Sequence, residues 1–352
     1  MRSLLPGFGC RSARPQALVV GPYRVHNFGD DLIGAVIAAR LRQQGYDVTI
    51  PKLGAENAIW IGTRFAEDYE GAFERADLVV VGGGGIMSDT AGAKPGASYL
   101  DIVSRAAREG RLGEKRLVVT GVGAGPWLRE RSRELARDVS DRAEHVGVRD
   151  GESYDHLLTL GVAEEKIVEG ADIALLTSEY LRFRRRRTRR IGLQYDIAAF
   201  PDVHENPRIG EITDAVQAFA RANASRSVLV SNGRHRSQLA DSAPETPLLR
   251  YEELRTFLPR LAEMSAIFTS HLHLAITAYS QRVPCFSLYV REKTRRFYDQ
   301  IGHPERAVDL CKATPADFRR LIREAEHATW TTADEKRLAG LKTESAKLLA
   351  LL

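Results

Sequence analysis

Two histidines stand two positions apart in an otherwise apolar stretch, IFTSHLHLAITAYSQRVPCFSLYV, which covers residues 267–290. A metal site, a catalytic histidine and two histidines in a packed helix all fit this pattern. A helix has about 3.6 residues per turn, so side chains two positions apart point about 200° away from each other. His271 and His273 therefore cannot bind one metal ion from a regular helix, and no further ligand set with metal spacing lies nearby.

We therefore expect no metal at this segment. Ser270 has the character of an N-cap, which predicts a helix that begins directly before the histidines. One histidine at a helix N-terminus, next to a ligand, is the chemical hypothesis for this stretch. A histidine whose hydrogen bonds are satisfied within the core is the alternative, and the spacing leaves both open.

A second candidate is HNFGDDLIG, residues 26–34, where a predicted strand passes into a predicted helix. Asn27 and Asp30 lie in this turn, and the N-terminus of a helix presents free N–H groups that bind anions or hydroxyls. Both residues are therefore candidates to bind an anion or a hydroxyl group. A simple capped turn, with Asp30 as the cap, is the alternative.

A third candidate is the glycine run in VVVGGGGIMSD, residues 79–89. Glycines after a buried strand let a ligand approach the backbone closely, so Gly83, Gly84 and Gly85 are ligand-binding candidates. The run matches neither a dinucleotide fingerprint nor a P-loop. A second glycine-rich strand end, GVGAGP, follows in the same half of the chain.

The fourth candidate is Arg149 in GVRDGES, residues 147–153. It stands at the end of a predicted strand, and a guanidinium group can bind a carboxylate or a phosphate through two parallel hydrogen bonds. The alternative is a surface ion pair between Arg149 and Asp150.

The elements that must position these residues follow an alternating pattern. Short apolar runs rich in β-branched residues alternate with helical periodicity, and the pattern restarts after residue 190. Such alternation is typical of parallel sheets covered by helices on both faces. We predict an α/β protein with two Rossmann-like, doubly wound domains that face a cleft, with ligands at the carboxyl ends of the strands.

Domain boundaries follow from this pattern and from composition. We expect a disordered arm at 1–16, domains at 17–181 and 191–330, an arginine-rich linker at 182–190 and a C-terminal helix at 331–352. Thr314, Pro315 and Asp317 predict a helix start. Thr332 and Glu335 form the pattern of a capping box.

Charge and cysteine content exclude several classes of protein. The net charge is +5, and the segment RFRRRRTRR, residues 182–190, holds seven arginines. Without stacking aromatics beside them, these predict no nucleic-acid partner; a solvated linker or a weak contact with an anionic membrane remains. Three scattered cysteines fit a reducing cytoplasm, and no apolar run is long enough to span a membrane.

Taken in order, the motifs resemble the polysaccharide pyruvyl transferase family between Leu18 and Phe297. The segments that carry the resemblance are NFGDD, GGGGIMSD, VRDGESYDHLLTLGV, GADIALL and TSHLHLAITAYSQRVPCFSLYVREK. The resemblance implies a GT-B-like pair of domains and a transferase without metal or cofactor. Its donor would be phosphoenolpyruvate, and its acceptor two hydroxyls of a sugar in a surface polysaccharide or a lipid-linked precursor.

The resemblance also assigns roles. It makes His273 the candidate acid and base, because an imidazole with an ordinary pKa near ~6.5 can both donate and remove protons at neutral pH. It adds Arg291 and Lys293 as donor-binding candidates, together with His271 and the glycines at 83–85, and it makes Arg149 a catalytic candidate beside His273. Asn27 and Asp30 become the candidates that hold the acceptor hydroxyls. His271 stands where the family has arginine, which weakens anion binding unless another cation replaces it.

Compensation for that lost arginine has candidates in Arg234 and Arg236 of SNGRHRS. Two other functions stay open at this point. One is a GT-B glycosyltransferase that uses a nucleotide sugar, because a fold does not determine the chemistry. The other is a glycan-binding relative without catalysis. The sequence does not indicate an oligomeric state.

Overall fold

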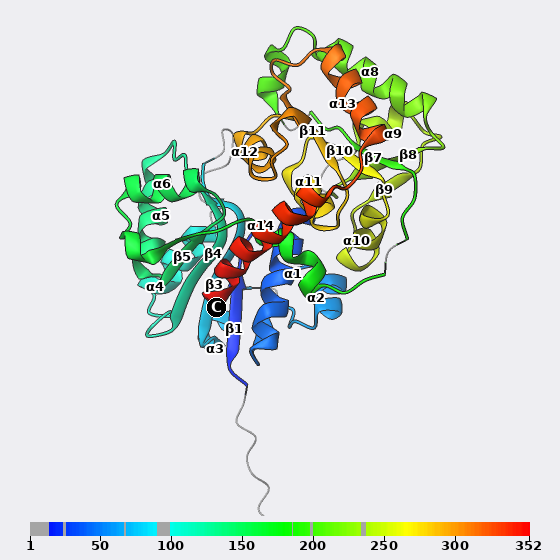
Figure 1. The fold of residues 1–352 in the computed structure, drawn as a ribbon. Coiled ribbons are helices and arrows are strands. Elements are labelled where there is room, and N and C mark those ends of the chain that lie inside the picture. The colour runs from blue at the N-terminus through cyan, green and yellow to red at the C-terminus, as the bar shows by residue number, and fades with distance from the viewer. Residues whose placement is uncertain are drawn as a thin grey trace, which may run out of the picture.

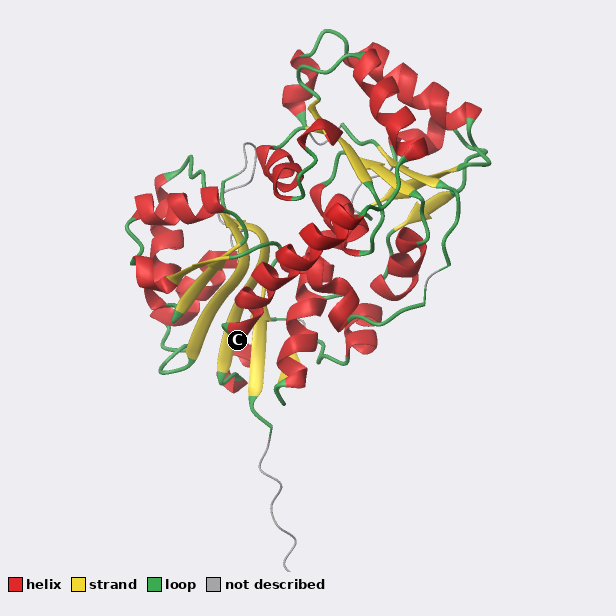
Figure 2. Ribbon diagram, viewed as in Figure 1, coloured by secondary structure: helices red, strands yellow, loops and turns green. Residues whose placement is uncertain are grey.

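The computed structural model describes residues 14–23, 26–66, 68–89, 99–184, 186–197, 200–233 and 237–352. It has two α/β domains, each built on a parallel sheet of six strands, with helices on both faces of the sheets (Figures 1 and 2). The predicted fold class, two doubly wound domains, is confirmed.

The N-terminal sheet has the strand order β2-β1-β3-β4-β5-β6, and all its neighbouring strands run parallel. Its strands are β1 (Gln16–Val20), β2 (Asp47–Thr49), β3 (Leu78–Met87), β4 (Arg116–Ala124), β5 (His145–Val148) and β6 (Ile167–Glu169). Its helices are α1 (Phe28–Gln43), α2 (Ala55–Ile61), α3 (Glu70–Arg75), α4 (Tyr99–Arg108), α5 (Glu130–Arg142), α6 (Gly151–Leu160) and α7 (Thr177–Tyr180), with 3-10 turns η2 (Glu164–Lys166) and η3 (Ile173–Leu176). Strand β3 runs on through the glycine run to Met87, beyond its predicted end.

The C-terminal sheet has the order β12-β11-β10-β7-β8-β9 and is also parallel. Its strands are β7 (Ile191–Gln194), β8 (Ser227–Ser231), β9 (Leu248–Arg250), β10 (Ala266–Thr269), β11 (Cys285–Tyr289) and β12 (Ala307–Asp309). Its helices are α8 (Ile209–Ala222), α9 (Gln238–Ser242), α10 (Leu254–Ala262), α11 (Leu272–Ser280), α12 (Glu292–Gln300) and α13 (Pro315–His327), with 3-10 turns η4 (Pro201–Glu205) and η5 (Pro304–Arg306).

The last helix, α14 (Thr332–Ala350), returns to the N-terminal domain (Figure 1). The Thr120 hydroxyl donates to the Leu348 carbonyl at 2.8 Å, and the Ser345 hydroxyl donates to the Asp172 carbonyl at 3.0 Å. Both ends of the chain therefore stabilise the same domain, and α14 supports the backbone of Asp172.

Two helix starts test the capping predictions. Helix α13 begins as predicted, with Thr314 and Asp317 forming a capping box. The predicted box of Thr332 and Glu335 is wrong by one residue, since Thr331 and Asp334 form it. Glu335 instead accepts two hydrogen bonds of 2.7 Å from the Arg282 guanidinium, so its carboxylate is occupied elsewhere.

Candidate active site

The side chains of Arg149, Asp172 and His273 meet where the two domains touch. Arg149, directly after β5, donates from Nη1 to Oδ2 of Asp172 at 3.0 Å. His273 of α11, in the other domain, places Nε2 3.7 Å from the same oxygen. The three side chains are nearly buried, with exposures of 5% for Arg149, 3% for Asp172 and 14% for His273. Arg149 is therefore no surface residue, although its Nε also lies 3.8 Å from Oδ2 of Asp150.

Asp172 orients this group, although sequence reasoning did not list it as a site residue. It caps η3, and its Oδ1 accepts from the Ala174 N–H at 3.0 Å. Burial alone raises a carboxyl pKa, but His273, Arg149 and the Ala174 N–H outweigh that effect and hold the pKa of Asp172 below its usual range. Asp172 is thus a carboxylate at neutral pH. The one sequence signal that could have identified Asp172 as a site residue was its place in the family-like segment GADIALL.

Helix α12 brings two more cations to this place. Burial, followed by the charges of Arg149 and Arg291, lowers the pKa of Lys293 to about 8, while Asp30 and Asp172 oppose the shift. Such mutual effects require the charges to lie close together. Arg149, Asp172, His273, Lys293 and Arg291 are called the charged cluster below.

The N-terminus of α1 borders the charged cluster. Asn27 is the N-cap, and its Oδ1 accepts from the Gly29 N–H at 3.1 Å. Asn27 rather than Asp30 therefore caps the helix. The His273 ring packs directly on Gly29, where an added Cβ would lie 2.0 Å from Nδ1 of the ring. Only a glycine at position 29 leaves room for this histidine.

Substitution of Gly29 by alanine is expected to displace His273 and lower turnover at least tenfold, because the new methyl group would overlap the imidazole. Gly210→Ala is the matched control: it is also the second residue of its helix, and nothing lies within 4 Å of an added Cβ. Equal turnover by the two variants, measured with correctly folded protein, would show that the His273 position does not depend on Gly29.

The three glycines predicted to bind a donor have different surroundings. A Cβ at Gly83 would meet Ile33 at 2.1 Å, and a Cβ at Gly84 would meet Oδ1 of Asp30 at 2.8 Å. Both glycines have positive φ, and because they lack a Cβ, helix α1 can pack closely against the sheet at these positions. Gly85 is exposed. The helix explains two of the glycines through packing, and donor binding at all three stays a prediction.

His271 is the N-cap of α11, so the prediction that Ser270 caps this helix is wrong. The Ser270 hydroxyl instead donates to Oε1 of Gln194 at 3.2 Å, and the His271 N–H donates to the Thr269 hydroxyl at 2.9 Å. Nδ1 of His271 lies 3.2 Å from the amide nitrogen of Asn232.

An arginine reaches the neighbourhood of His271 by another route. The Phe200 and His271 rings lie 6.1 Å apart between centroids, and the Arg291 guanidinium lies 5.3 Å from the centre of the Phe200 ring. Arg234 and Arg236, the candidates for compensation, lie outside the described residues. Arg291 is therefore the described cation that these contacts connect to His271, through the Phe200 ring.

A second polar network ties α1 to the C-terminal domain. The Tyr251 hydroxyl donates to Oδ2 of Asp31 at 2.7 Å, and the Asn57 amide donates to the Tyr251 oxygen at 2.9 Å. The Phe28 ring packs on Tyr251 with centroids 5.4 Å apart. Burial raises the pKa of Asp31 to about 7, with a smaller opposing effect of the Tyr251 hydroxyl. This interface is therefore sensitive to pH near neutrality.

A raised carboxyl pKa stabilises the folded chain below the ordinary value near ~4, and this stabilisation disappears as the pH rises through about 7. We expect the unfolding midpoint of the wild type to fall between pH 6 and 8, and Asp31→Asn to flatten that slope. Thermal unfolding across this range measures it, with exposed Asp68→Asn as the control. Parallel slopes for the wild type and Asp31→Asn would contradict the assignment.

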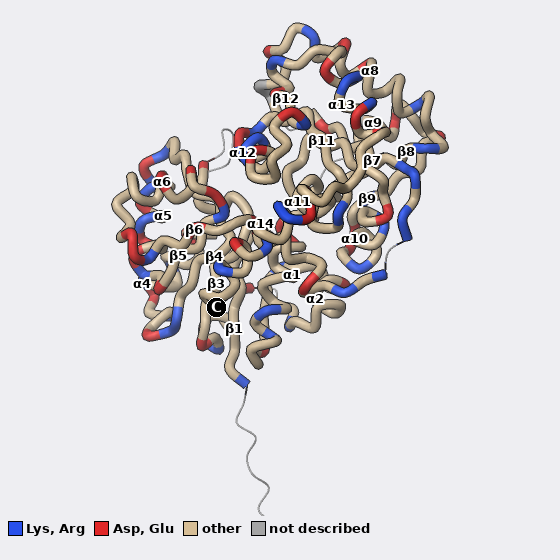
Figure 3. The backbone as a smooth tube through the Cα atoms, in the orientation of Figure 1, with Lys and Arg blue, Asp and Glu red and all other residues tan. Residues whose placement is uncertain are grey.

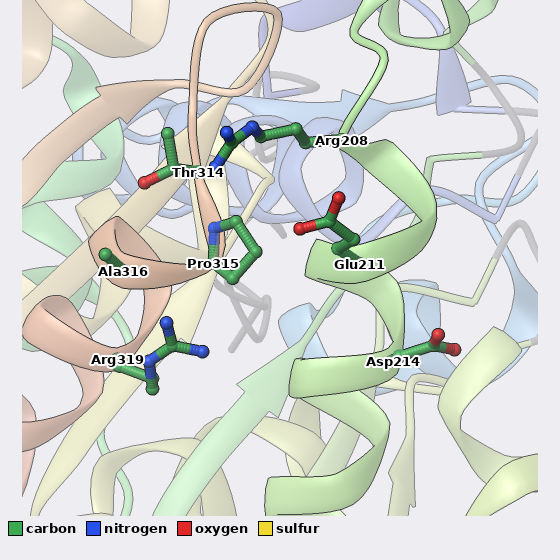
Figure 4. A pocket seen from close by; sticks show the side chains of 7 residues that line it. All are labelled: Arg208, Glu211, Asp214, Thr314, Pro315, Ala316 and Arg319. Carbon is green, nitrogen blue, oxygen red and sulfur yellow. The ribbon is translucent and has the colours of Figure 1, made fainter.

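A pocket of about 400 Å³ lies between α8 and α13, and Figure 4 shows the side chains that line it. Both helices lie at the end of the molecule away from the N-terminal domain (Figure 1). Its acids and arginines lie on the open surface, and its Thr314 already belongs to a capping box. Within the described ranges, no three histidine, cysteine, aspartate or glutamate side chains are arranged to hold a metal ion.

Comparisons with known proteins place this geometry in context. A family model described as polysaccharide pyruvyl transferase matches residues 27–292, more than half of the chain. These residues include the whole charged cluster except Lys293, which follows the last matched residue. A comparison with curated proteins gives no match.

Solved structures of similar fold include UDP-N-acetylglucosamine 2-epimerases and a glycotransferase. A putative UDP-N-acetylglucosamine 2-epimerase from Listeria monocytogenes superposes with a TM-score of 0.62 at 12% identity, covering 96% of each chain. The UDP-GlcNAc 2-epimerase of Neisseria meningitidis bound to UDP-GlcNAc has a TM-score of 0.57 at 13% identity, covering 96% of this chain and 99% of that chain. The glycotransferase of kitacinnamycin superposes with a TM-score of 0.52 at 14% identity, covering 96% of each chain. At these identities the likeness shows the two-domain GT-B fold alone.

Proposed function

The chain belongs to the polysaccharide pyruvyl transferase family, and on this premise we propose that it transfers the enolpyruvyl unit of phosphoenolpyruvate to a sugar, where the unit becomes a pyruvate ketal. The sugar belongs to a surface polysaccharide or its precursor. The observation that carries the proposal is the charged cluster, in which His273 lies beside a buried carboxylate and among three cations.

The donor makes demands that the charged cluster meets. Phosphoenolpyruvate carries a phosphate and a carboxylate, and both groups favour guanidinium and ammonium partners. Arg149, Lys293 and Arg291 supply such partners from both domains. Lys293, with a pKa of about 8, is still mostly protonated at pH 7, and a bound anion favours its charged form further.

The reaction requires several proton transfers. One sugar hydroxyl attacks C2 of the enol while C3 receives a proton and becomes a methyl group. A second hydroxyl then attacks C2, and the C2–O bond to phosphate breaks. The two hydroxyl protons balance the proton gained by C3 and the proton gained by phosphate. His273, held by Asp172, is the group that donates and removes protons.

The acceptor hydroxyls are assigned to Asn27 and Asp30 at the start of α1. Oδ1 of Asn27 is occupied by the Gly29 N–H, which leaves its amide NH₂ as a donor. Asp30 supplies an acceptor near the glycine run. The two residues therefore offer both hydrogen-bonding roles that a sugar hydroxyl needs.

Arg291 compensates for the arginine that the family has at position 271. It reaches the neighbourhood of His271 through Phe200 and acts on Lys293 electrostatically. His271 then contributes hydrogen bonding, and Arg291 contributes the permanent charge.

The direct test is phosphate release from phosphoenolpyruvate with a panel of bacterial glycan acceptors. We expect release only when an acceptor is present, together with a pyruvate ketal on the product. No release with any acceptor, combined with thermal stabilisation by uridine diphosphate and none by phosphoenolpyruvate, would instead identify a nucleotide-sugar enzyme.

A lipid-linked acceptor would bring the enzyme to an anionic membrane surface. Figure 3 shows in blue the described arginines of residues 182–190, along the connection that leads into the C-terminal domain. They are exposed, and they form no ion pair with described residues. In the described part of the chain, no helix is long and apolar enough to cross a membrane. Attachment would then rest on charge, and each arginine near an anionic surface contributes about 1 kcal/mol.

Replacement of Arg184, Arg186 and Arg189 by glutamine is therefore expected to lower the affinity for vesicles containing phosphatidylglycerol about 100-fold. Co-sedimentation with the vesicles measures this affinity. The matched control replaces three exposed arginines of α5, Arg131, Arg133 and Arg137, with the same change in net charge. Equal binding by both triple variants would show that the linker has no special role.

A further inference from the structure

Helix α12 connects the two halves of the charged cluster. Its N-terminal end carries Arg291, as N-cap, and Lys293. Its C-terminal half reaches across to the N-terminal domain, where it contacts the two residues that follow β5. One short helix therefore touches the cluster from both domains.

Three polar interactions of α12 cross between the domains. Nη1 of Arg296 donates to Oδ1 of Asp150 at 2.8 Å and lies 3.3 Å from Oε2 of Glu152. Nε2 of Gln300 donates to the carbonyl oxygen of Arg149 at 3.3 Å. Arg296 is 18% exposed and Asp150 10% exposed, so this ion pair is more strongly shielded from solvent than a surface pair.

Asp150 joins this contact to the site. Its Oδ1 also accepts from the Ser153 N–H at 2.9 Å and caps α6. The Arg149 side chain, one residue earlier, binds Asp172. Arg296 and Gln300 thus hold the chain directly after the Arg149 Cα, through the Asp150 side chain and the Arg149 carbonyl. The same helix and its N-cap supply the other cations, and α11 supplies His273.

We propose that Arg296, assisted by Gln300, is a positioning residue that sets the separation between Arg149 of one domain and Lys293 and His273 of the other. Arg296 does not contact the donor. It keeps the cations of the two domains at a spacing that lets one molecule with two anionic groups bind to both. This role rests on the proposed function.

Matched variants of α12 test the proposal. Arg296→Gln removes the charge, and Arg296→Lys retains it. Arg295→Gln is the control, because Arg295 has its ion pairs within its own helix, with Glu292 and Asp299. We expect Arg296→Gln to raise the KM for phosphoenolpyruvate about tenfold with little change in kcat, Arg296→Lys to recover most of that loss, and Arg295→Gln to match the wild type.

A second measurement does not depend on the donor. Small-angle X-ray scattering of the free protein should show a larger radius of gyration for Arg296→Gln than for the wild type and Arg295→Gln. An unchanged KM together with an unchanged radius would overturn the proposal. If the wild type uses no phosphoenolpyruvate, the proposed function fails, and the radius alone decides whether Arg296 sets the domain spacing.

Discussion

Replacement of His273 by alanine is expected to lower turnover by about 10²- to 10⁴-fold, the range typical for loss of a general acid or base. The change removes the imidazole that would protonate C3 and accept a hydroxyl proton, while Arg149 and Lys293 remain to bind the donor. The KM for phosphoenolpyruvate should therefore change much less than kcat. Phosphate release under saturating acceptor measures both constants.

The control for this variant is His204→Ala, which removes an exposed histidine of the same domain. It should retain wild-type turnover. If His273→Ala also kept full turnover, the assignment of His273 as acid and base would be wrong, and a role in packing against Gly29 would be sufficient to explain its place.

Replacement of Asp172 by asparagine is expected to impair both activity and stability. Asparagine keeps the size of the side chain but leaves the buried Arg149 without its close counter-charge, and breaking a buried pair in this way costs about 3 kcal/mol or more. His273 also loses the carboxylate that lies 3.7 Å from its Nε2. Turnover and urea unfolding measure the two effects, and the exposed Asp155→Asn is the control.

The stability loss carries a pH signature. Since the folded pKa of Asp172 is depressed, its contribution is fully present above the ordinary value near ~3.9 and is lost as the pH falls below it. The wild type should lose this contribution on acidification, and Asp172→Asn should lack that part of the acid dependence. Equal stability of the two proteins at pH 7 would contradict the assignment of a buried ion pair.

Much of the architecture was predictable from local patterns. Continuous apolar strands followed by helical periodicity identified two parallel α/β domains, and Gly161 ends α6 with a left-handed conformation as its sequence predicts. Four motifs at strand ends were expected to converge, and Asn27, Arg149 and His273 lie in the same region. Their convergence follows from the rule that parallel strands bring their carboxyl ends to one edge.

Helix α12 was not predicted, for a physical reason. Its nine residues, EKTRRFYDQ, include only two large apolar side chains, Phe297 and Tyr298, and both are buried. So short a segment has too few apolar positions to show a period, and its stability comes from tertiary packing. The contacts of Arg296 and Gln300 with the other domain were invisible for the same reason.

Asp172 escaped notice as a site residue because its role depends on contacts with Arg149 and His273, which are 23 and 101 residues away in sequence. A lone aspartate after a strand is equally typical of a helix cap, which it also is. Likewise, three of the glycines at positions 82–85 have packing partners on α1 that only the folded chain reveals.

A crystal structure of the protein with phosphoenolpyruvate would test the central claim most directly. We expect density for phosphoenolpyruvate between Arg149 and His273, with its phosphate or carboxylate bound by Lys293 or Arg291. Donor density at another site, or a charged cluster that stays empty at saturating donor, would contradict it.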